Sequence, residues 1–131
     1  MFGTISTIWI AVAWFTDKDL YNLLVLKQQE GLNIQLIIMD DSINILNYEI
    51  FEVYKVKKIG IHKNLMHNKF CIIDLKTVIH GSFNWTTKAN YNRETIEIIH
   101  GFGHEHVEKF LNQFIELKRE FLYNRIGSLS K

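Results

Sequence analysis

The chain has 131 residues, of which 47% are hydrophobic and 22% charged, a balance that excludes a disordered polypeptide and predicts one domain over residues 1–131. Fifteen Lys and Arg against 14 Asp and Glu give a net charge of +1, so bulk charge identifies no class of partner. The single cysteine, Cys71, excludes an intrachain disulfide and a cysteine-based zinc finger. It is compatible with a reducing, cytoplasmic location, and we expect it to pack in the interior.

The longest apolar run of the chain extends from Ile8 to Phe15, which is eight residues. A membrane-spanning helix needs about 20. No basic region precedes an apolar stretch at the N-terminus, so a signal peptide is not expected. No amphipathic basic helix or apolar anchor is evident either, which disfavours a membrane partner.

The first 40 residues predict a strand, a helix and a second strand. Residues 5–15 are dense in Ile, Val, Trp and Phe, which favours a buried strand. Thr16 can cap a helix over 17–30, and Gly31 can end it. Residues 33–39 predict another buried strand. This order indicates a βαβ unit with parallel strands.

The rest of the chain predicts a short helix, four strands and a long terminal helix, at 43–51, 52–56, 69–74, 77–82, 95–99 and 105–123. In the terminal helix, apolar residues recur at helical spacing and form a stripe for docking on a sheet, namely Val107, Phe110, Leu111, Phe114, Leu117 and Phe121. Residues 124–131 are expected to fray. The predicted fold class is α/β, with a mixed, mainly parallel sheet flanked by helices on both faces.

The chemically informative segment is HNKFCIIDLKTVIHGSFNWT, residues 67–86. On a strand, residues i and i+2 point to the same face, so His67 and Lys69 would project together. Ser82 and Asn84 have the same spacing at the following strand. Two adjacent strands can therefore present a histidine, a lysine, a serine and an asparagine side by side.

These residue types suit an anionic, tetrahedral reacting centre. Lysine and asparagine donate hydrogen bonds to phosphoryl oxygens, and histidine can act as a nucleophile or a general acid near neutral pH. The segment lacks the clustered carboxylates that a Mg²⁺-dependent phosphotransferase needs. We therefore expect phosphoryl transfer through a phosphohistidine, with no metal and no cofactor.

The pattern His67-x-Lys69-x4-Asp74-x6-Gly81-Ser82-x-Asn84 resembles the HKD motif of the phospholipase D superfamily. IWIAVAWFTDKDLYNLL resembles the family's first strand and helix, and GLNIQLIIMDD resembles its second strand. The resemblance thus covers roughly residues 5–99 and implies the phospholipase D-like sandwich fold. The chain opens almost directly on the first strand, whereas a helix often precedes this strand in the family. The sequence could therefore be part of a longer protein.

The resemblance implies a role for each motif residue. His67 would attack phosphorus, while Lys69 and Asn84 would hold the nonbridging oxygens. Ser82 would assist the phosphate site; the alternative is a hydroxyl satisfied by backbone at the end of a strand.

Two carboxylates complete the candidate catalytic set. Glu94 resembles the acidic residue that family members place behind the histidine, where it would orient His67; the alternative is a solvated carboxylate at a sheet edge. Asp74 belongs to the motif, and a structural role is favoured over a chemical one.

The reaction needs a second histidine. While His67 is bound to phosphorus, the leaving oxygen needs a proton from another group, and family members of this mechanism use two motifs. This chain has one motif, so we expect a homodimer with a composite site, in which the partner supplies the second histidine.

The substrate is predicted from size and from local charge. Single-motif members of the family are small nuclease-type phosphodiesterases, which favours an endonuclease acting on DNA or RNA. Residues 55–69 hold five lysines and no acid. Lys57, Lys58 and Lys63 would then track a polyanion, although a solvated loop guarded by lysines explains them equally well. The alternatives are a lipid phosphodiesterase and a non-catalytic nucleic-acid-binding module.

Two further polar clusters are more consistent with capping than with metal binding. His100, His104 and His106 match no metal-ligand spacing and lie at a strand-to-helix junction. Asp40 and Asp41 follow a strand and precede a predicted helix, a position typical of caps.

Overall fold

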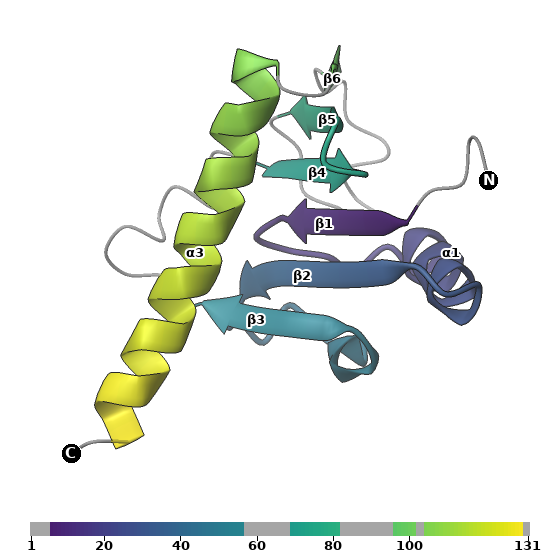
Figure 1. Cartoon of the computed structure of the whole chain (residues 1–131). Helices are drawn as coiled ribbons and strands as arrows, with labels where there is room; N and C mark the ends of the chain where they lie inside the picture. Colours follow the sequence, from purple (N-terminus) through teal and green to yellow (C-terminus); the bar gives the residue numbers. More distant parts are fainter. Residues whose placement is uncertain (1–5, 57–68, 82–95, 102–103, 130–131) are drawn as a thin grey trace.

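The computed structural model describes residues 6–56, 69–81, 96–101 and 104–129. These residues form one sheet with a helix on each side (Figure 1). In chain order the elements are β1 (Thr7–Ala11), α1 (Lys18–Gln29), β2 (Asn33–Met39), the 3-10 helix η1 (Tyr48–Ile50), β3 (Glu52–Val56), β4 (Lys69–Ile73), β5 (Thr77–Gly81), β6 (Ile96–His100) and α3 (Glu105–Leu129). The predicted strands at 33–39 and 52–56 are observed with these same bounds, and the others agree to within a few residues.

The six strands have the order β3-β2-β1-β4-β5-β6, so the first strand of the chain lies in the middle of the sheet. β1, β2 and β3 run parallel, whereas β4, β5 and β6 are joined by antiparallel pairing, and β4 pairs antiparallel with β1. The predicted mixed sheet is confirmed. The expected predominance of parallel pairs is wrong, because a tight turn joins β4 to β5 and such turns connect antiparallel strands.

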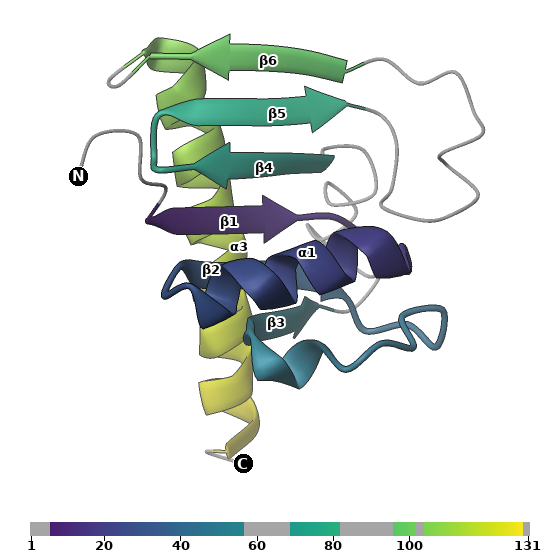
Figure 2. The same cartoon turned by 90° about the vertical axis from the view of Figure 1, so that its right-hand side faces the viewer.

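One face of the sheet is covered by α3, which crosses the strands behind the sheet in Figure 2. The predicted apolar stripe is confirmed: Val107, Phe114 and Leu117 are buried against the sheet. Phe114 stacks on Trp9 of β1 with ring centroids 5.1 Å apart. The central strand and the terminal helix are thus joined by aromatic packing.

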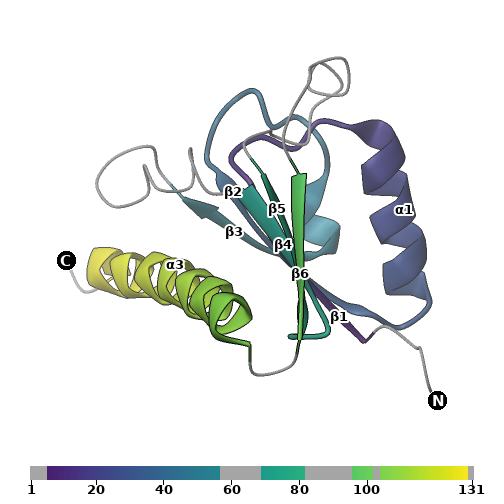
Figure 3. The same ribbon diagram turned by 90° about the horizontal axis from the view of Figure 1, so that it is seen from above.

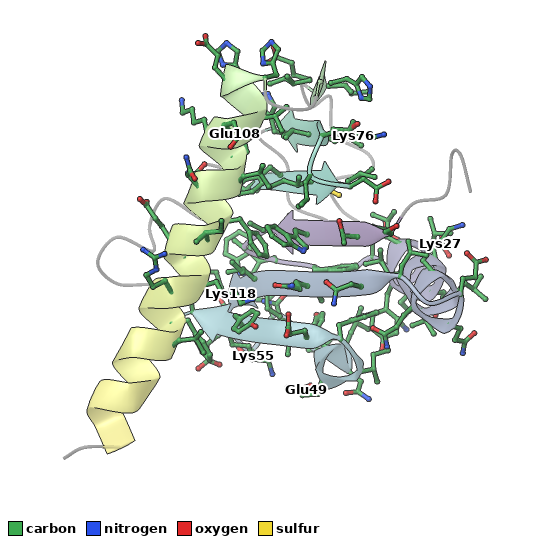
Figure 4. All side chains as sticks on the ribbon, viewed as in Figure 1. Lys27, Glu49, Lys55, Lys76, Glu108 and Lys118 are labelled. Carbon is green, nitrogen blue, oxygen red and sulfur yellow. The ribbon has the colours of Figure 1, made fainter. Side chains whose placement is uncertain are left out.

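Polar contacts also hold α3 in place. Lys118 Nζ donates to Gln35 Oε1 over 3.0 Å and lies 5.2 Å from the centroid of the Tyr54 ring (Figure 4). Gln35 is buried, so this hydrogen bond satisfies an oxygen that water reaches poorly. Helix α3 continues to Leu129, beyond the predicted end at 123.

The opposite face is covered by α1 and η1 over β1, β2 and β3 (Figures 2 and 3). Leu24 of α1 is buried there with Phe15 and Tyr48. The Tyr48 hydroxyl donates to the backbone oxygen of Phe15, and burial raises the pKa of this phenol. Helices therefore flank both faces of the sheet, as the sequence predicts.

The cap of α1 differs from the prediction. Asp17 caps the helix instead of Thr16, since its Oδ1 accepts from the N–H groups of Asp19 and Leu20 over 3.0 and 3.2 Å. A carboxylate is favoured here because it also complements the positive end of the helix dipole. Gly31, predicted to end the helix, does so with φ of +98°.

The predicted helix at 43–51 is wrong except for η1. Residues 40–47 form a loop. The side chains of Asp41 and Asn44 hydrogen-bond to backbone groups of the loop and of neighbouring segments, and such bonds compete with those of a helix. This loop lies where β2 ends.

Candidate active site

The strand ends that flank the motif all meet at one edge of the sheet, which we call the catalytic edge. β1, β2, β3 and β5 end there, and β4 and β6 begin there (Figure 2). The pairing shows this directly: Lys69, the first residue of β4, lies opposite Gly81, the last residue of β5. Gly81 in turn lies opposite Ile96, the first residue of β6. Loops at such an edge are where open α/β sheets bind ligands.

Lys69 is the one predicted catalytic residue that the structure describes at this edge. Its side chain is 8% exposed, which is unusual for a lysine. It begins β4, and alternation along the strand places it on the same face as Cys71, the face that α1 covers. This buried lysine pairs with Gly81 and so lies beside the last residue of β5.

The other predicted residues near the edge lie outside the described residues. They are His67, Ser82, Asn84 and Glu94, with Lys57, Lys58 and Lys63. Their places in the chain can still be compared with the sheet. His67 precedes Lys69 by two residues and Ser82 directly follows Gly81, so both adjoin one paired position. In the sequence, Glu94 precedes Ile96, the first residue of β6, by two residues.

Asp74 lies at the other end of β4, one residue after the strand. At the usual rise of a strand, its Cα is roughly 16 Å from that of Lys69. Its Oδ1 accepts hydrogen bonds from the N–H groups of Ser6 and Thr7, over 2.6 and 3.0 Å. The structure therefore does not bring Asp74 together with Lys69.

Asn44, which was not predicted from the sequence, organises the catalytic edge. Its Nδ2 donates to the backbone oxygens of Ala13 and Met39, over 3.0 and 2.8 Å, and its Oδ1 accepts from the N–H of Phe15 over 2.8 Å. One side chain thus joins the segments that follow β1 and β2. The signal was the run Asp-Asp-Ser directly after a buried strand, a composition typical of loops.

Asp41 adds a second connection at this edge. Its Oδ2 accepts from Trp14 Nε1 over 3.1 Å, and its Oδ1 accepts from the N–H of Ile43 over 3.0 Å. The indole of Trp14 packs against the core on the α3 side of the sheet. The predicted helix cap at Asp41 is therefore wrong, because no helix begins here and the carboxylate bonds within the loop instead.

Cys71 is buried, and burial raises the pKa of its thiol to about 12. A thiol in this state is protonated at neutral pH and is a poor nucleophile. Cys71 packs with Ile10 and Phe15 between the sheet and α1, which confirms the packing role expected from the sequence.

Of the three clustered histidines, His104 bonds at the start of α3. His104 Nδ1 accepts from the N–H of His106 over 3.2 Å, and His104, His106 and His100 are exposed. Among the described residues, no three His, Cys, Asp or Glu side chains are grouped closely enough to hold a metal ion.

Residues 3–118 match the family model described as "Cardiolipin synthase, PLD-like domain". The chain belongs to the phospholipase D-like family. The resemblance drawn from the HKD motif is therefore confirmed.

Among curated relatives, the mitochondrial cardiolipin hydrolases of Canis lupus familiaris and Mus musculus are 33% and 32% identical over 82% and 88% of this chain. The alignments cover 43% and 53% of those proteins. A phospholipase D of Rickettsia felis is 28% identical over 86% of this chain and 58% of its own length. The chain thus spans about half the length of the curated relatives it matches.

Two solved structures share the fold. Nuc from Salmonella typhimurium, a phospholipase D family member, superposes with a TM-score of 0.70 at 23% identity, covering 89% of this chain and 80% of Nuc. NucT from Helicobacter pylori has a TM-score of 0.66 at 23% identity, covering 87% of this chain and 79% of NucT. Among the described helices, none is both long and apolar enough to cross a bilayer.

Proposed function

We propose that this protein is a metal-independent phosphodiesterase that cleaves nucleic-acid phosphodiester bonds through a phosphohistidine at His67. The observation that carries the proposal is the pairing of Lys69 with Gly81, because the two halves of the motif adjoin this one position at the catalytic edge. Membership of the phospholipase D-like family supports the same reaction class.

The proposed reaction has two steps. An imidazole nitrogen of His67 attacks phosphorus, the bond to the leaving oxygen breaks, and a second histidine gives that oxygen a proton. Water then attacks phosphorus, the second histidine takes its proton, and the bond from phosphorus to His67 breaks. Lys69 and Asn84 would stabilise the charge that develops on the nonbridging oxygens. Ser82 would assist the phosphate site and Glu94 would orient His67.

The second histidine is proposed to be His67 of another copy, in a homodimer. The chain contains one HxK sequence, at 67–69. Neither His80 nor His100 replaces it. His80 faces α3, where its ring centroid lies 4.8 Å from that of Phe110, and His100 ends β6 at the edge opposite Lys69.

Nucleic acid is the first candidate substrate, supported by the five lysines of residues 55–69. This segment connects β3 to β4, and both strands meet the catalytic edge, so Lys57, Lys58 and Lys63 would lie along the approach to the site. A lipid phosphodiester is the second candidate. It is supported by three mitochondrial cardiolipin hydrolases that are 31–33% identical to this chain.

Hydrolysis of bis(p-nitrophenyl) phosphate in EDTA tests the chemistry, and labelled DNA, labelled RNA and cardiolipin vesicles identify the substrate. We expect His67→Ala and Lys69→Met to lose activity at least about a thousandfold, since each removes a group used in the transition state. His106→Ala is the matched control, because His106 is exposed on α3. Activity that EDTA abolishes and Mg²⁺ restores would contradict the proposed mechanism.

Mixing wild type with His67→Ala tests the composite site. If one active site needs His67 from both copies, an equal mixture with free exchange retains about a quarter of the wild-type activity, against half for independent sites. Sedimentation showing monomers at micromolar concentration would contradict the homodimer. The phosphodiesterase chemistry would then still be tested by hydrolysis of bis(p-nitrophenyl) phosphate.

A further inference from the structure

The loop between β2 and η1, residues 40–47, carries two exposed isoleucines at the catalytic edge. Ile43 is 49% exposed and Ile45 is 75% exposed. Among the large apolar residues that the structure describes, Ile45 is the most exposed. In Figure 2 the loop extends from the sheet on the side where β1 and β3 end, and Figure 3 shows it on that same side from above.

The loop is held in this conformation by its polar residues. Asn44 lies between the two isoleucines and makes its three hydrogen bonds to Ala13, Met39 and Phe15. On one side Asp41 accepts from the N–H of Ile43, and on the other the hydroxyl of Tyr21 donates to the backbone oxygen of Asn47 over 2.7 Å. The chain is thus fixed on both sides of the exposed pair, so the isoleucines are displayed by a preorganised loop.

Other apolar residues at the end of this loop pack in or against the core, unlike the two isoleucines. Leu46 packs against the α1-side core and Tyr48 is fully buried in it. Single exposed apolar residues are common and need no explanation. Here, however, two exposed aliphatic residues flank one anchored asparagine beside the catalytic edge, so they are not a single exposed residue.

We propose that Ile43 and Ile45 insert into a lipid surface and dock the catalytic edge against it. The proposal rests on the proposed function only for the location of the active site. The exposed pair offers on the order of 200 Å², far below the roughly 800 Å² per partner of a stable protein interface. It also lacks the aromatic and arginine side chains in which protein interfaces are enriched. A shallow apolar tip instead suits the boundary between headgroups and acyl chains.

The charge of the loop specifies the kind of surface. Asp40 is exposed and Asp41 lies beside it, so the tip itself does not favour a strongly anionic membrane. Binding should therefore be apolar in origin and little affected by salt, unlike adsorption through lysines. The sequence alone disfavoured a membrane partner because no anchor was evident in it; the exposure of this pair becomes visible only in the fold.

Flotation of the purified protein with phosphatidylcholine vesicles tests the proposal. We expect wild type to float, and Ile43→Ser/Ile45→Ser to lose about tenfold or more in partition coefficient. The matched control is Ile50→Ser/Ile98→Ser, because these isoleucines are 38% and 66% exposed but lie away from the catalytic edge. The control should float like wild type, and raising the salt from 0.1 to 0.5 M should leave flotation unchanged.

Ile45→Trp gives a second readout that does not depend on loss of binding. Its fluorescence should shift to the blue when vesicles are added, as the indole enters a less polar environment. The proposal is overturned if wild type stays unbound, if the control double variant loses as much binding, or if this emission does not change.

Hydrolysis of bis(p-nitrophenyl) phosphate separates this proposal from the proposed function. Ile43→Ser/Ile45→Ser should hydrolyse the soluble diester at the wild-type rate, which also shows that it folds. Wild type that hydrolyses the diester but does not bind vesicles overturns the lipid contact alone. Wild type that binds vesicles but hydrolyses no diester overturns the proposed function alone.

Discussion

Asp74 and Thr7 exchange a reciprocal pair of hydrogen bonds where β4 ends and β1 begins. The N–H of Thr7 donates to Asp74 Oδ1, and the N–H of Asp74 donates to the backbone oxygen of Thr7, each over 3.0 Å. Asp74 has φ of 53°, in the left-handed region that aspartate and asparagine tolerate better than most residues. The motif aspartate thus ties the start of the central strand to the β4–β5 turn.

Asp74→Ala should lower the free energy of unfolding by about 2–3 kcal/mol, because it removes the acceptor of two backbone donors and a residue suited to positive φ. Asp74→Asn should cost about half as much, since it keeps an oxygen acceptor. Urea denaturation measures both values. Hydrolysis of bis(p-nitrophenyl) phosphate by folded Asp74→Asn should stay within about twofold of wild type. A hundredfold loss with the fold intact would instead place Asp74 in the chemistry.

Asn44→Ala should destabilise the protein by about 2–3 kcal/mol, because it removes three hydrogen bonds at the catalytic edge. Asn44→Asp should be similarly harmful, since a carboxylate cannot donate to the oxygens of Ala13 and Met39. Asn47→Ala is the control, because its described hydrogen bond uses only the backbone oxygen. Thermal unfolding that ranks Asn47→Ala with Asn44→Ala would contradict the assignment.

Phe114→Ala should lower the free energy of unfolding by about 3–5 kcal/mol, because it removes a buried ring that stacks on Trp9. Ile115→Ala, at the adjacent residue on the exposed side of α3, should change it by less than about 0.5 kcal/mol. Urea denaturation of the two variants compares them directly. Equal losses would mean that α3 docks on the sheet by another face.

Stability should fall as the solution becomes alkaline. Burial raises the pKa of Cys71 to about 12, whereas an unfolded thiol ionises near pH 8.5. A raised pKa in the folded state stabilises the protein fully below the unfolded value, and this contribution is lost as the pH rises from there towards 12. Tyr48, whose pKa is also raised by burial, adds to the loss above about pH 10.

Urea denaturation between pH 8 and 10.5 measures this dependence. The slope of the free energy of unfolding against pH reports how many more protons the folded state binds than the unfolded state. Replacing Cys71 with Ala should lower this number by about one at the upper end of the range. Tyr48→Phe should leave the slope below pH 9.5 as in wild type. Identical slopes for wild type and Cys71→Ala would show that the thiol is not buried in solution.

Much of this architecture could be predicted because the core strands and α3 have strong local patterns. Residues 36–39 are a continuous apolar run within β2, and apolar residues in 105–123 repeat at helical spacing, so burial and local periodicity agree. The motif also identified the edge where Lys69 begins β4. Sequence patterns at the ends of elements carry less information, as the cap at Asp17 instead of Thr16 shows.

What the sequence could not predict depends on contacts between distant residues. Asn44 bonds to Phe15 and Ala13, about 30 residues away in the chain, and these bonds convert a predicted helix into a loop. Asp74 is five residues from Lys69 in the chain, yet it contacts Ser6, 68 residues away. Long-range pairing decides such positions, and no local pattern records it.

The central place of β1 has a consequence for synthesis of the protein. β2 follows within one βα unit and can pair with one side of β1 early, but β4, which pairs with the other side, begins at Lys69. Until β4 has emerged from the ribosome, one edge of the apolar strand β1 stays unpaired. Its free backbone donors and acceptors are a template for unwanted pairing. Chains truncated before residue 69 should therefore aggregate, and shielding of β1 during translation would govern the yield of folded protein.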